Sequence, residues 1–287
     1  MFRLNANIFK MSSAVRWAFN WKEWNPSREE FEHAISCVQS EEKARLGKFV
    51  FRKDVRASLA GRLLMRKFVN EYAGLPYDEI TFIRDEHNKP LLKDNAGAIS
   101  FNVSHQGSYA VLAGEIRDVK LGVDVMALEY TGGKSISEFF RIMNRNFSAA
   151  EWGEIKGSAP GKSEMEQISM FCRHWALKES YVKALGVGIV VDLRNIDFRT
   201  NSELSKDSVT TDTVLYVDDI KQNWLFEETL LDSRHCVAVA LQEDEKSLLH
   251  NTTFEIIDYD KLITHSVPLF PIDSQYTTQY FAKSERP

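Results

Sequence analysis

Cysteine is scarce in this chain of 287 residues, which contains only three, Cys37, Cys172 and Cys236. They are odd in number, far apart and without a Cys-x-x-Cys pair, which argues against a disulfide framework and against a cysteine-based zinc site. This usage fits a reducing compartment. We therefore expect the protein to work in the cytoplasm, in the cytosol.

Long apolar runs and an excess of positive charge are also missing. No segment approaches the ~20 apolar residues that a membrane-spanning helix needs, so we expect no membrane partner. The chain has 36 Lys and Arg residues and 41 Asp and Glu residues, which gives a formal net charge of -5. This balance argues against a protein that coats nucleic acid, although a small basic pocket is compatible with it. A hydrophobic fraction of 44% is ample for packed cores and excludes disorder as the main state.

Glycine-rich phosphate-binding loops are absent, since neither Gly-x-Gly-x-x-Gly nor a Walker A pattern occurs. Any bound phosphate must therefore be held by side chains. The N-terminal segment carries Arg3, Lys10 and Arg16 but no acid before Glu23, a faint transit-peptide composition. We favour a plain extension, because the aromatic run at 17–24 is better explained by a packed strand and turn.

The predicted elements follow a similar order in two stretches of the chain. The first has helical periodicity over 27–72, and then strand patterns at 80–84, 99–103, 109–113 and 119–126, with a loop at 104–108. After a Gly-rich break at 131–133, helical patterns return at 135–141, 149–156 and 167–185, and strand patterns at 192–198, 213–217, 224–228 and 236–241. We predict an α+β fold of two pseudo-symmetric halves, 1–130 and 131–245. The polar tail, 246–287, is expected to be peripheral or partly disordered.

The segment FCRHWALKESYVKALGVG, at 171–188, is the most informative. On a helix, Phe171, Trp175, Glu179 and Lys183 follow one another at i+4 steps, which leads from aromatic residues to a carboxylate and an ammonium group. Spacing alone favours an exposed ion pair between Glu179 and Lys183, worth only about 0.2–0.5 kcal/mol.

A second segment, LGVDVM at 121–126, places an acid inside an apolar strand. A buried carboxylate must be hydrogen-bonded, paired or metal-bound, because isolated burial of its charge is very costly. Asp124 is thus a candidate ligand for a hard metal ion. A strand-end aspartate that caps the next turn is an equally good interpretation of this segment alone.

The third segment is FNVSHQG, at 101–107. Ser104 and His105 are adjacent, so in an extended strand their side chains point to opposite faces and cannot form a nucleophile and base pair. A histidine and a glutamine, Gln106, on a hairpin loop suit contacts to phosphate or metal. A turn without any role in a site is an equally good interpretation.

Taken together, LGVDVM and WALKESYVKALG resemble the signature of the 4'-phosphopantetheinyl transferase superfamily, a G-x-D strand followed by a W-x-x-K-E-(S/A)-x-x-K helix. The pieces EEKARLGKFVF, AGRLLMRK, the Lys89-Pro90 turn and FNVSHQGSYAVLA resemble its long, monomeric, surfactin-synthetase-activating type, so the likeness spans 15–241. The resemblance implies an active site in a cleft between the two halves. It also implies Mg²⁺-dependent transfer of 4'-phosphopantetheine from coenzyme A to a serine of an apo carrier protein, which leaves adenosine 3',5'-bisphosphate.

The resemblance also assigns roles to residues. It implies that Asp124 and Glu179 hold Mg²⁺, that Glu179 takes the serine proton, and that Lys183, assisted by Lys178, carries phosphate charge. Where many bacterial relatives have a second acid, this chain has Met126, a poor Mg²⁺ ligand, so Gln106 or a water is expected to fill that position. The further coenzyme A contacts that it implies are Arg45, Arg84, Asn88, Lys89, Asn102, Ser104 and His105.

The expected protein partners are apo acyl carrier protein domains of the fatty acid synthase, mitochondrial and aminoadipate-semialdehyde dehydrogenase types. One chain would supply both walls of the cleft, so we expect a monomer. Two other functions use parts of the same pattern. One is a non-catalytic module that binds coenzyme A or a carrier protein, and the other is a metal-dependent phosphodiesterase acting on nucleotides.

Overall fold

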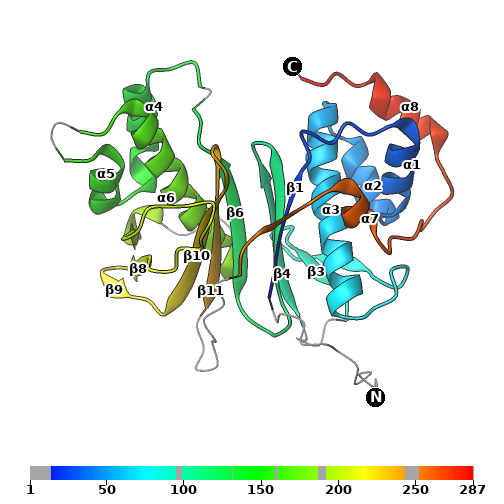
Figure 1. The fold of residues 1–287 in the computed structure, drawn as a ribbon, viewed down its shortest axis with the longest axis horizontal. Helices are drawn as coiled ribbons and strands as arrows, with labels where there is room; N and C mark the ends of the chain where they lie inside the picture. The colour runs from blue at the N-terminus through cyan, green and yellow to red at the C-terminus, as the bar shows by residue number, and fades with distance from the viewer. Residues whose placement is uncertain are drawn as a thin grey trace.

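The computed structural model describes residues 14–94, 99–130, 132–158, 161–186, 192–242 and 252–286. Two β-sheets face each other in the centre of the molecule, and helices cover the outer face of each sheet (Figure 1). Arg3 and Lys10 of the N-terminal segment lie outside the described residues. Within the described ranges, no helix combines the length and the apolar character that crossing a membrane requires.

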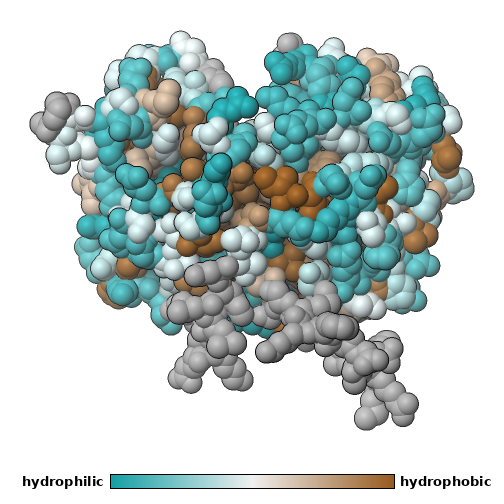
Figure 2. Space-filling view, in the orientation of Figure 1, coloured by the Kyte–Doolittle hydropathy of each residue, from teal (hydrophilic) through white to brown (hydrophobic). Residues whose placement is uncertain are grey.

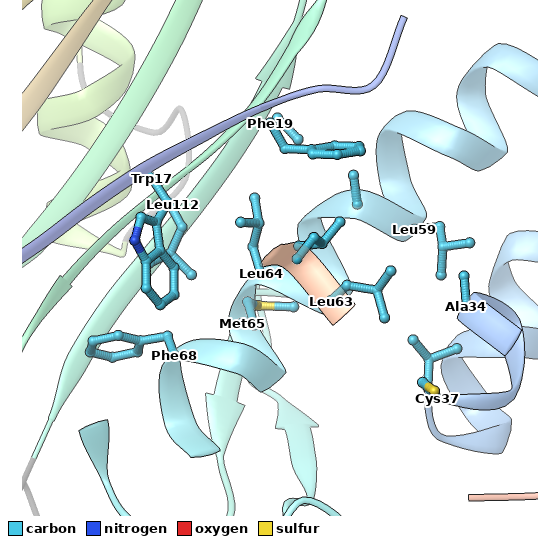
Figure 3. Packing of buried hydrophobic residues seen from close by; sticks show 14 of the residues in the cluster. Trp17, Phe19, Ala34, Cys37, Leu59, Leu63, Leu64, Met65, Phe68 and Leu112 are labelled. Carbon is cyan, nitrogen blue, oxygen red and sulfur yellow. The ribbon is translucent and has the colours of Figure 1, made fainter. Parts of the chain in front are cut away.

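The first half begins with a strand, continues with helices and ends with a hairpin. Its elements are β1 (Ala14–Asn20), α1 (Arg28–Ser36), α2 (Ser40–Gly47), α3 (Arg52–Tyr72), β2 (Phe82–Arg84), β3 (Pro90–Leu92), β4 (Ser100–Gln106) and β5 (Tyr109–Glu115). In its main sheet, β5 pairs antiparallel with both β1 and β4. Trp17 and Leu112 of this sheet lie against the apolar stripe of α3, which includes Leu64 and Phe68 (Figure 3).

The second half repeats this plan. Its elements are β6 (Leu121–Ala127), α4 (Ile136–Met143), the 3-10 turn η1 (Asn144–Asn146), α5 (Ala149–Lys156), α6 (Glu164–Leu185), the 3-10 turn η2 (Leu193–Asn195), β7 (Ile196–Arg199), β8 (Val214–Val217), β9 (Ile220–Lys221), β10 (Trp224–Asp232) and β11 (His235–Gln242). Here β11 pairs antiparallel with both β6 and β10, as β5 does with β1 and β4. The predicted α+β fold with two halves of similar order is confirmed.

The position of β6 differs from the prediction. The sequence pattern assigned this strand to the first half, with the division at the Gly-rich break at 131–133. In the structure β6 pairs with β11 along its whole length, so it opens the second half. A strand's own sequence does not show which neighbour it will pair with, since both faces of β6 are apolar apart from Asp124.

Aliphatic side chains fill the space between the two sheets. They come from both halves and include Ala18, Val111, Ala113, Val123, Val125, Val237 and Val239. On the face shown in Figure 2, apolar residues gather along the line where the halves meet, and the flanks are mainly hydrophilic. This sheet-on-sheet packing fixes the halves against each other over a continuous apolar core.

Arg16 is buried in this interface. Its guanidinium group forms ion pairs with Glu115 of β5 (2.8 Å) and with Glu227 of β10 (2.7 Å). A buried charge needs such partners. Arg16 therefore belongs to β1 and links the two halves. It is not part of an N-terminal extension.

The C-terminal tail is folded, and the expectation that it is peripheral or partly disordered is wrong for residues 252–286. β12 (Glu255–Ile257) adds a parallel strand beside β1, and α7 (Tyr259–Ile263) and α8 (Ser274–Ala282) pack on the helices of the first half. Tyr280 of α8 stacks on Phe31 of α1 with 3.7 Å between ring centroids. Tyr280 is only 2% exposed, so the tail completes the core of the first half.

We expect Tyr280→Ala to destabilise the protein by about 3 kcal/mol, because it removes a buried aromatic ring and leaves a cavity against Phe31. Urea denaturation monitored by tryptophan fluorescence would measure this change. Gln279→Ala, at an exposed neighbouring position of α8, is the matched control and should shift the midpoint little. Equal midpoints for the two variants would contradict a structural role for α8.

Candidate active site

Gly122 allows β6 to lie directly against α6. A Cβ atom at this position would overlap the carbonyl oxygen of Ser180 and would lie 2.5 Å from the backbone nitrogen of Ala184. Any larger residue would push the strand and the helix apart. Asp124, two residues further on, points to the same face of β6 and therefore toward α6.

Asp124 is the centre of a hydrogen-bond network that joins three elements. Its Oδ1 accepts hydrogen bonds from Lys183 Nζ of α6 (2.5 Å) and from Ser104 Oγ of β4 (2.7 Å). Lys183 Nζ also donates to Ser104 Oγ (2.8 Å). The interpretation of Asp124 as a turn cap is thus wrong, since it lies within β6. The structure brings Asp124, Ser104 and Lys183 together from both halves.

Glu179 lies one turn before Lys183 on α6 and is half-buried. Partial burial, and then the negative charge of Asp124, raise the pKa of Glu179, while Lys183 acts in the opposite direction. Among the described residues, no hydrogen bond or ion pair engages its carboxylate, and the ion pair with Lys183 favoured by spacing is not formed. Glu179 is therefore an acid without its own partner that faces a second acid.

Asp124 and Glu179 together suit a hard divalent cation. Two neighbouring carboxylates repel each other unless a proton or a cation lies between them, and Mg²⁺ takes one or two carboxylates together with waters and substrate oxygens. No cluster of three or more acidic, histidine or cysteine side chains that could hold a metal occurs in the described part of the chain. Two carboxylates alone would leave the other coordination positions of such an ion to substrate and solvent.

A group of arginines surrounds Glu42 of α2. Its carboxylate forms ion pairs with Arg84 (2.8 Å) and Arg62 (2.5 Å), and Arg45 lies 3.9 Å away. Burial would raise the pKa of Glu42, but the hydrogen bond from Arg84 and the charges of Arg62 and Arg84 lower it. One carboxylate therefore holds three guanidinium groups in place, and the cluster keeps an excess of positive charge.

An open groove of about 590 Å³ lies beside this cluster, and Arg45, Arg84 and Lys93 are among the residues that line it. The sequence patterns assign no role to Glu42 or Arg62. Glu42 and Arg45 are three residues apart on one helix, which is the only local signal for the cluster. Arg62 and Arg84 come from elements far away in the chain, so their convergence has no local signature.

The β2–β3 hairpin connects the arginine cluster to α6. Lys89 Nζ donates to the carbonyl oxygen of Lys183 (3.1 Å), near the C-terminus of α6, where a cation is favoured. Burial lowers the pKa of Lys89, with Asp85 acting in the opposite direction. Asn88 adopts a positive φ of 63° in the turn, and its carbonyl oxygen accepts a hydrogen bond from Arg84 (2.6 Å). The side chain of Asn88 is exposed. In the described structure this residue therefore contributes to the turn through its backbone.

Lys178 is not brought to the site, and its assignment as a phosphate ligand is wrong. Its side chain is 1% exposed and pairs with Glu151 of α5 (2.9 Å). It also donates to the carbonyl oxygens of Leu193 (2.8 Å) and Ile196. Because adjacent helical residues are about 100° apart, Lys178 faces the interior of the second half while Glu179 lies on another side of the helix, where the charges of Asp124 and Lys183 act on it.

The amide side chains of β4 connect the two sheets. Asn102 Oδ1 accepts the backbone N–H of Val123 (2.9 Å), and Gln106 Oε1 accepts that of Ala127 (2.5 Å). These oxygens are the atoms that would bind a metal or accept from a ligand. Gln106 as the third metal ligand is therefore not supported, and Asn102 is buried as a structural link.

His105 lies on the opposite face of β4 from Ser104, as adjacent strand residues must. It retains contact with solvent. Desolvation by the surrounding protein is the largest cause that lowers its pKa, followed by the positive charges of Lys183 and Arg62. The predicted loop at 104–108 is wrong in its extent, since β4 continues to Gln106. Met126 is partly buried against the core of the second half.

Comparison with known proteins agrees with this arrangement. Residues 22–117 match the family model described as 4'-phosphopantetheinyl transferase, N-terminal, and residues 120–240 match that of the 4'-phosphopantetheinyl transferase superfamily. The boundary between the two matches falls between β5 and β6.

Individual relatives cover most of the chain. It is 40% identical, over 96% of its length and 94% of the relative's, to the L-aminoadipate-semialdehyde dehydrogenase-phosphopantetheinyl transferase of Xenopus laevis. The Homo sapiens protein of the same name is 39% identical over 91% of this chain and 89% of its own. The 4'-phosphopantetheinyl transferase Sfp of Bacillus subtilis is 29% identical over 62% of this chain and 73% of its own. From these matches and the site geometry, this chain is a transferase that belongs to the 4'-phosphopantetheinyl transferase superfamily.

Proposed function

We propose that this protein transfers 4'-phosphopantetheine from coenzyme A to the hydroxyl group of a serine in an apo carrier protein, with release of adenosine 3',5'-bisphosphate. The observation that carries the proposal is the convergence of Asp124, Glu179, Lys183 and Ser104 from both halves. Two acids beside one ammonium group supply what attack on a pyrophosphate needs, namely charge neutralisation and a base.

Glu179 is the general base of this proposal. Its carboxylate has no partner among the described residues, so it can accept the proton of the carrier serine. A raised pKa makes a carboxylate a stronger base as long as it remains ionised at the working pH. Lys183 lies one turn further along α6, where its ammonium group can hold negative charge on the phosphate that is attacked.

Asp124 and Glu179 would hold Mg²⁺. When bound, this ion would neutralise charge on the pyrophosphate oxygens of coenzyme A. Lys183 at present donates to Asp124, so its ammonium group is placed to move from the carboxylate to a phosphate oxygen when the substrate enters. Asp124 thus positions Lys183 as well.

Coenzyme A itself would be held by the basic residues next to this site. This basic surface suits a ligand with several phosphates. It consists of Arg84 and Arg45, which are arranged around Glu42, and of Lys89, which lies beside α6. Ser104 and His105 complete the contacts to phosphate.

The acceptors of this proposal are acyl carrier protein domains, among them the kind found in aminoadipate-semialdehyde dehydrogenase, which the names of the Xenopus laevis and Homo sapiens relatives mention. We propose that the protein acts as a monomer, because the two halves of one chain supply both walls of the site. We also propose that it works in the cytosol, which its few cysteines fit.

The test is incubation of the protein with coenzyme A, MgCl₂ and an apo carrier protein, followed by mass spectrometry of the carrier. We expect the carrier to gain one phosphopantetheinyl group. EDTA should stop the reaction and added Mg²⁺ should restore it, because without the ion the carboxylates of Asp124 and Glu179 would repel the negatively charged pyrophosphate.

Two outcomes would contradict the proposal. Release of free phosphopantetheine without an acceptor would indicate a phosphodiesterase. Binding of coenzyme A without added mass on any of several carriers would indicate a non-catalytic binding module.

A further inference from the structure

Two hairpin turns from opposite halves are joined at one end of the facing sheets. The backbone N–H of Ser108, in the β4–β5 turn, donates to Nε2 of His235, the first residue of β11 (3.1 Å). His235 is 3% exposed, and its ring packs edge-on against Tyr109 with 5.0 Å between centroids. This contact is therefore shielded from water.

The hydrogen bonds of His235 fix which ring nitrogen carries the proton. A backbone N–H can only donate, so Nε2 must accept and Nδ1 must carry the hydrogen. Nδ1 lies 2.9 Å from Oδ1 of Asp232. Partial burial acts to raise the pKa of Asp232, but hydrogen bonds from His235 and from the backbone of Arg234 lower it. An ionised Asp232 thus holds the ring as an acceptor for the Ser108 N–H.

The β4–β5 turn is shaped around this ring. Gly107 has a φ of +63°, and a Cβ atom at this position would overlap Nε2 of His235 and lie 2.9 Å from Cβ of Ala127. Gln106 also restricts the conformation of the turn, because its Oε1 accepts the N–H of Ala127. The end of β4 is thus held against β6 and β11 at successive residues.

We propose that His235 is a positioning residue for the transfer reaction. Through the N–H of Ser108 it holds the end of β4, and with it His105, in the position that contact with the coenzyme A phosphates requires. His235 itself touches no substrate. The inference rests on the proposed role of His105 in binding coenzyme A.

Two conservative variants separate this role from general stability. In His235→Gln the amide oxygen can take the place of Nε2 and accept the Ser108 N–H. In His235→Asn the shorter side chain keeps a polar group near Asp232 but cannot reach Ser108. We expect the KM for coenzyme A to rise about tenfold in His235→Asn and to remain near the wild-type value in His235→Gln, since only the former leaves a buried N–H unpaired. The KM for the carrier should change in neither.

The measurement is steady-state transfer to an apo carrier below the unfolding temperature of every variant. Leu262→Ala, in the core of the first half and away from the turn, is the destabilised control and should leave both KM values unchanged. In Gly107→Ala the added methyl group would collide with the His235 ring. This variant should therefore raise the KM for coenzyme A as His235→Asn does. If His235→Asn does not fold, this second variant decides.

Equal KM values for coenzyme A in the wild type and in His235→Asn or Gly107→Ala would overturn the positioning role. An equal rise in His235→Asn and His235→Gln would also overturn it, because the Ser108 hydrogen bond would then not be the cause. A wild-type protein without transfer activity would instead count against the proposed function.

Discussion

Glu179→Gln is expected to lower the turnover number about 10²- to 10⁴-fold, the range in which a general base contributes. The amide has nearly the same shape as the carboxylate but cannot take the proton of the carrier serine. The basic residues around Glu42 and the β2–β3 hairpin are not altered. Coenzyme A binding, measured by calorimetry, should therefore remain largely intact while transfer is lost.

Glu164→Gln, on the exposed first turn of the same helix, is the matched control for this substitution. It changes the net charge of α6 by the same amount but lies far from Asp124 along the helix. Its turnover should equal that of the wild type. Near-normal turnover in Glu179→Gln would refute the role of this carboxylate as the base.

Gly122→Ala is expected to destabilise the protein by about 3 kcal/mol. The added methyl group would meet the backbone of α6 at Ser180 and Ala184, and backbone atoms inside a helix cannot move aside singly. The strand and helix would have to separate, which would also move Asp124 away from Glu179. Urea denaturation should show the loss of stability, and transfer activity should fall with it even in the folded protein.

Gly153→Ala provides the opposite case with the same chemical change. Among the described residues, no heavy atom outside its helix lies within 4 Å of the position that its Cβ would take, and Gly153 is inside α5. This variant should be more stable by about 0.4–1 kcal/mol, since alanine restricts the unfolded chain. If Gly122→Ala and Gly153→Ala unfold at the same urea concentration, the close contact between β6 and α6 is not what stabilises the fold.

The close approach at Gly122 explains part of the signature by which the family was predicted from the sequence. The glycine lets α6 approach β6, and the aspartate two residues later then reaches the last turns of that helix. The likeness to the family predicted that Asp124, Glu179 and Lys183 would come together. The spacing of the residues on the helix did not, because it favoured an exposed ion pair that the structure does not contain.

Other assignments failed where the direction of a side chain decides the role. Lys178 is next to Glu179 in the sequence, yet the turn of the helix buries it against Glu151. Asn102 and Gln106 carry suitable donor atoms, yet those atoms join β4 to β6. Glu42 received no assignment, although three arginines from α2, α3 and β2 gather around it.

By itself, the sequence determined the α+β class, the order of most helices and strands, and the family, because periodicity and short motifs are properties of neighbouring residues. Cysteine scarcity argued against a disulfide framework, and the slight acidic excess argued against a protein that coats nucleic acid. Only the tertiary structure decided that β6 opens the second half, that the tail completes the first core, and which polar atoms are free to bind a substrate. Those outcomes depend on contacts between residues far apart in the chain, and on burial that leaves each polar group either paired within the protein or open to a ligand.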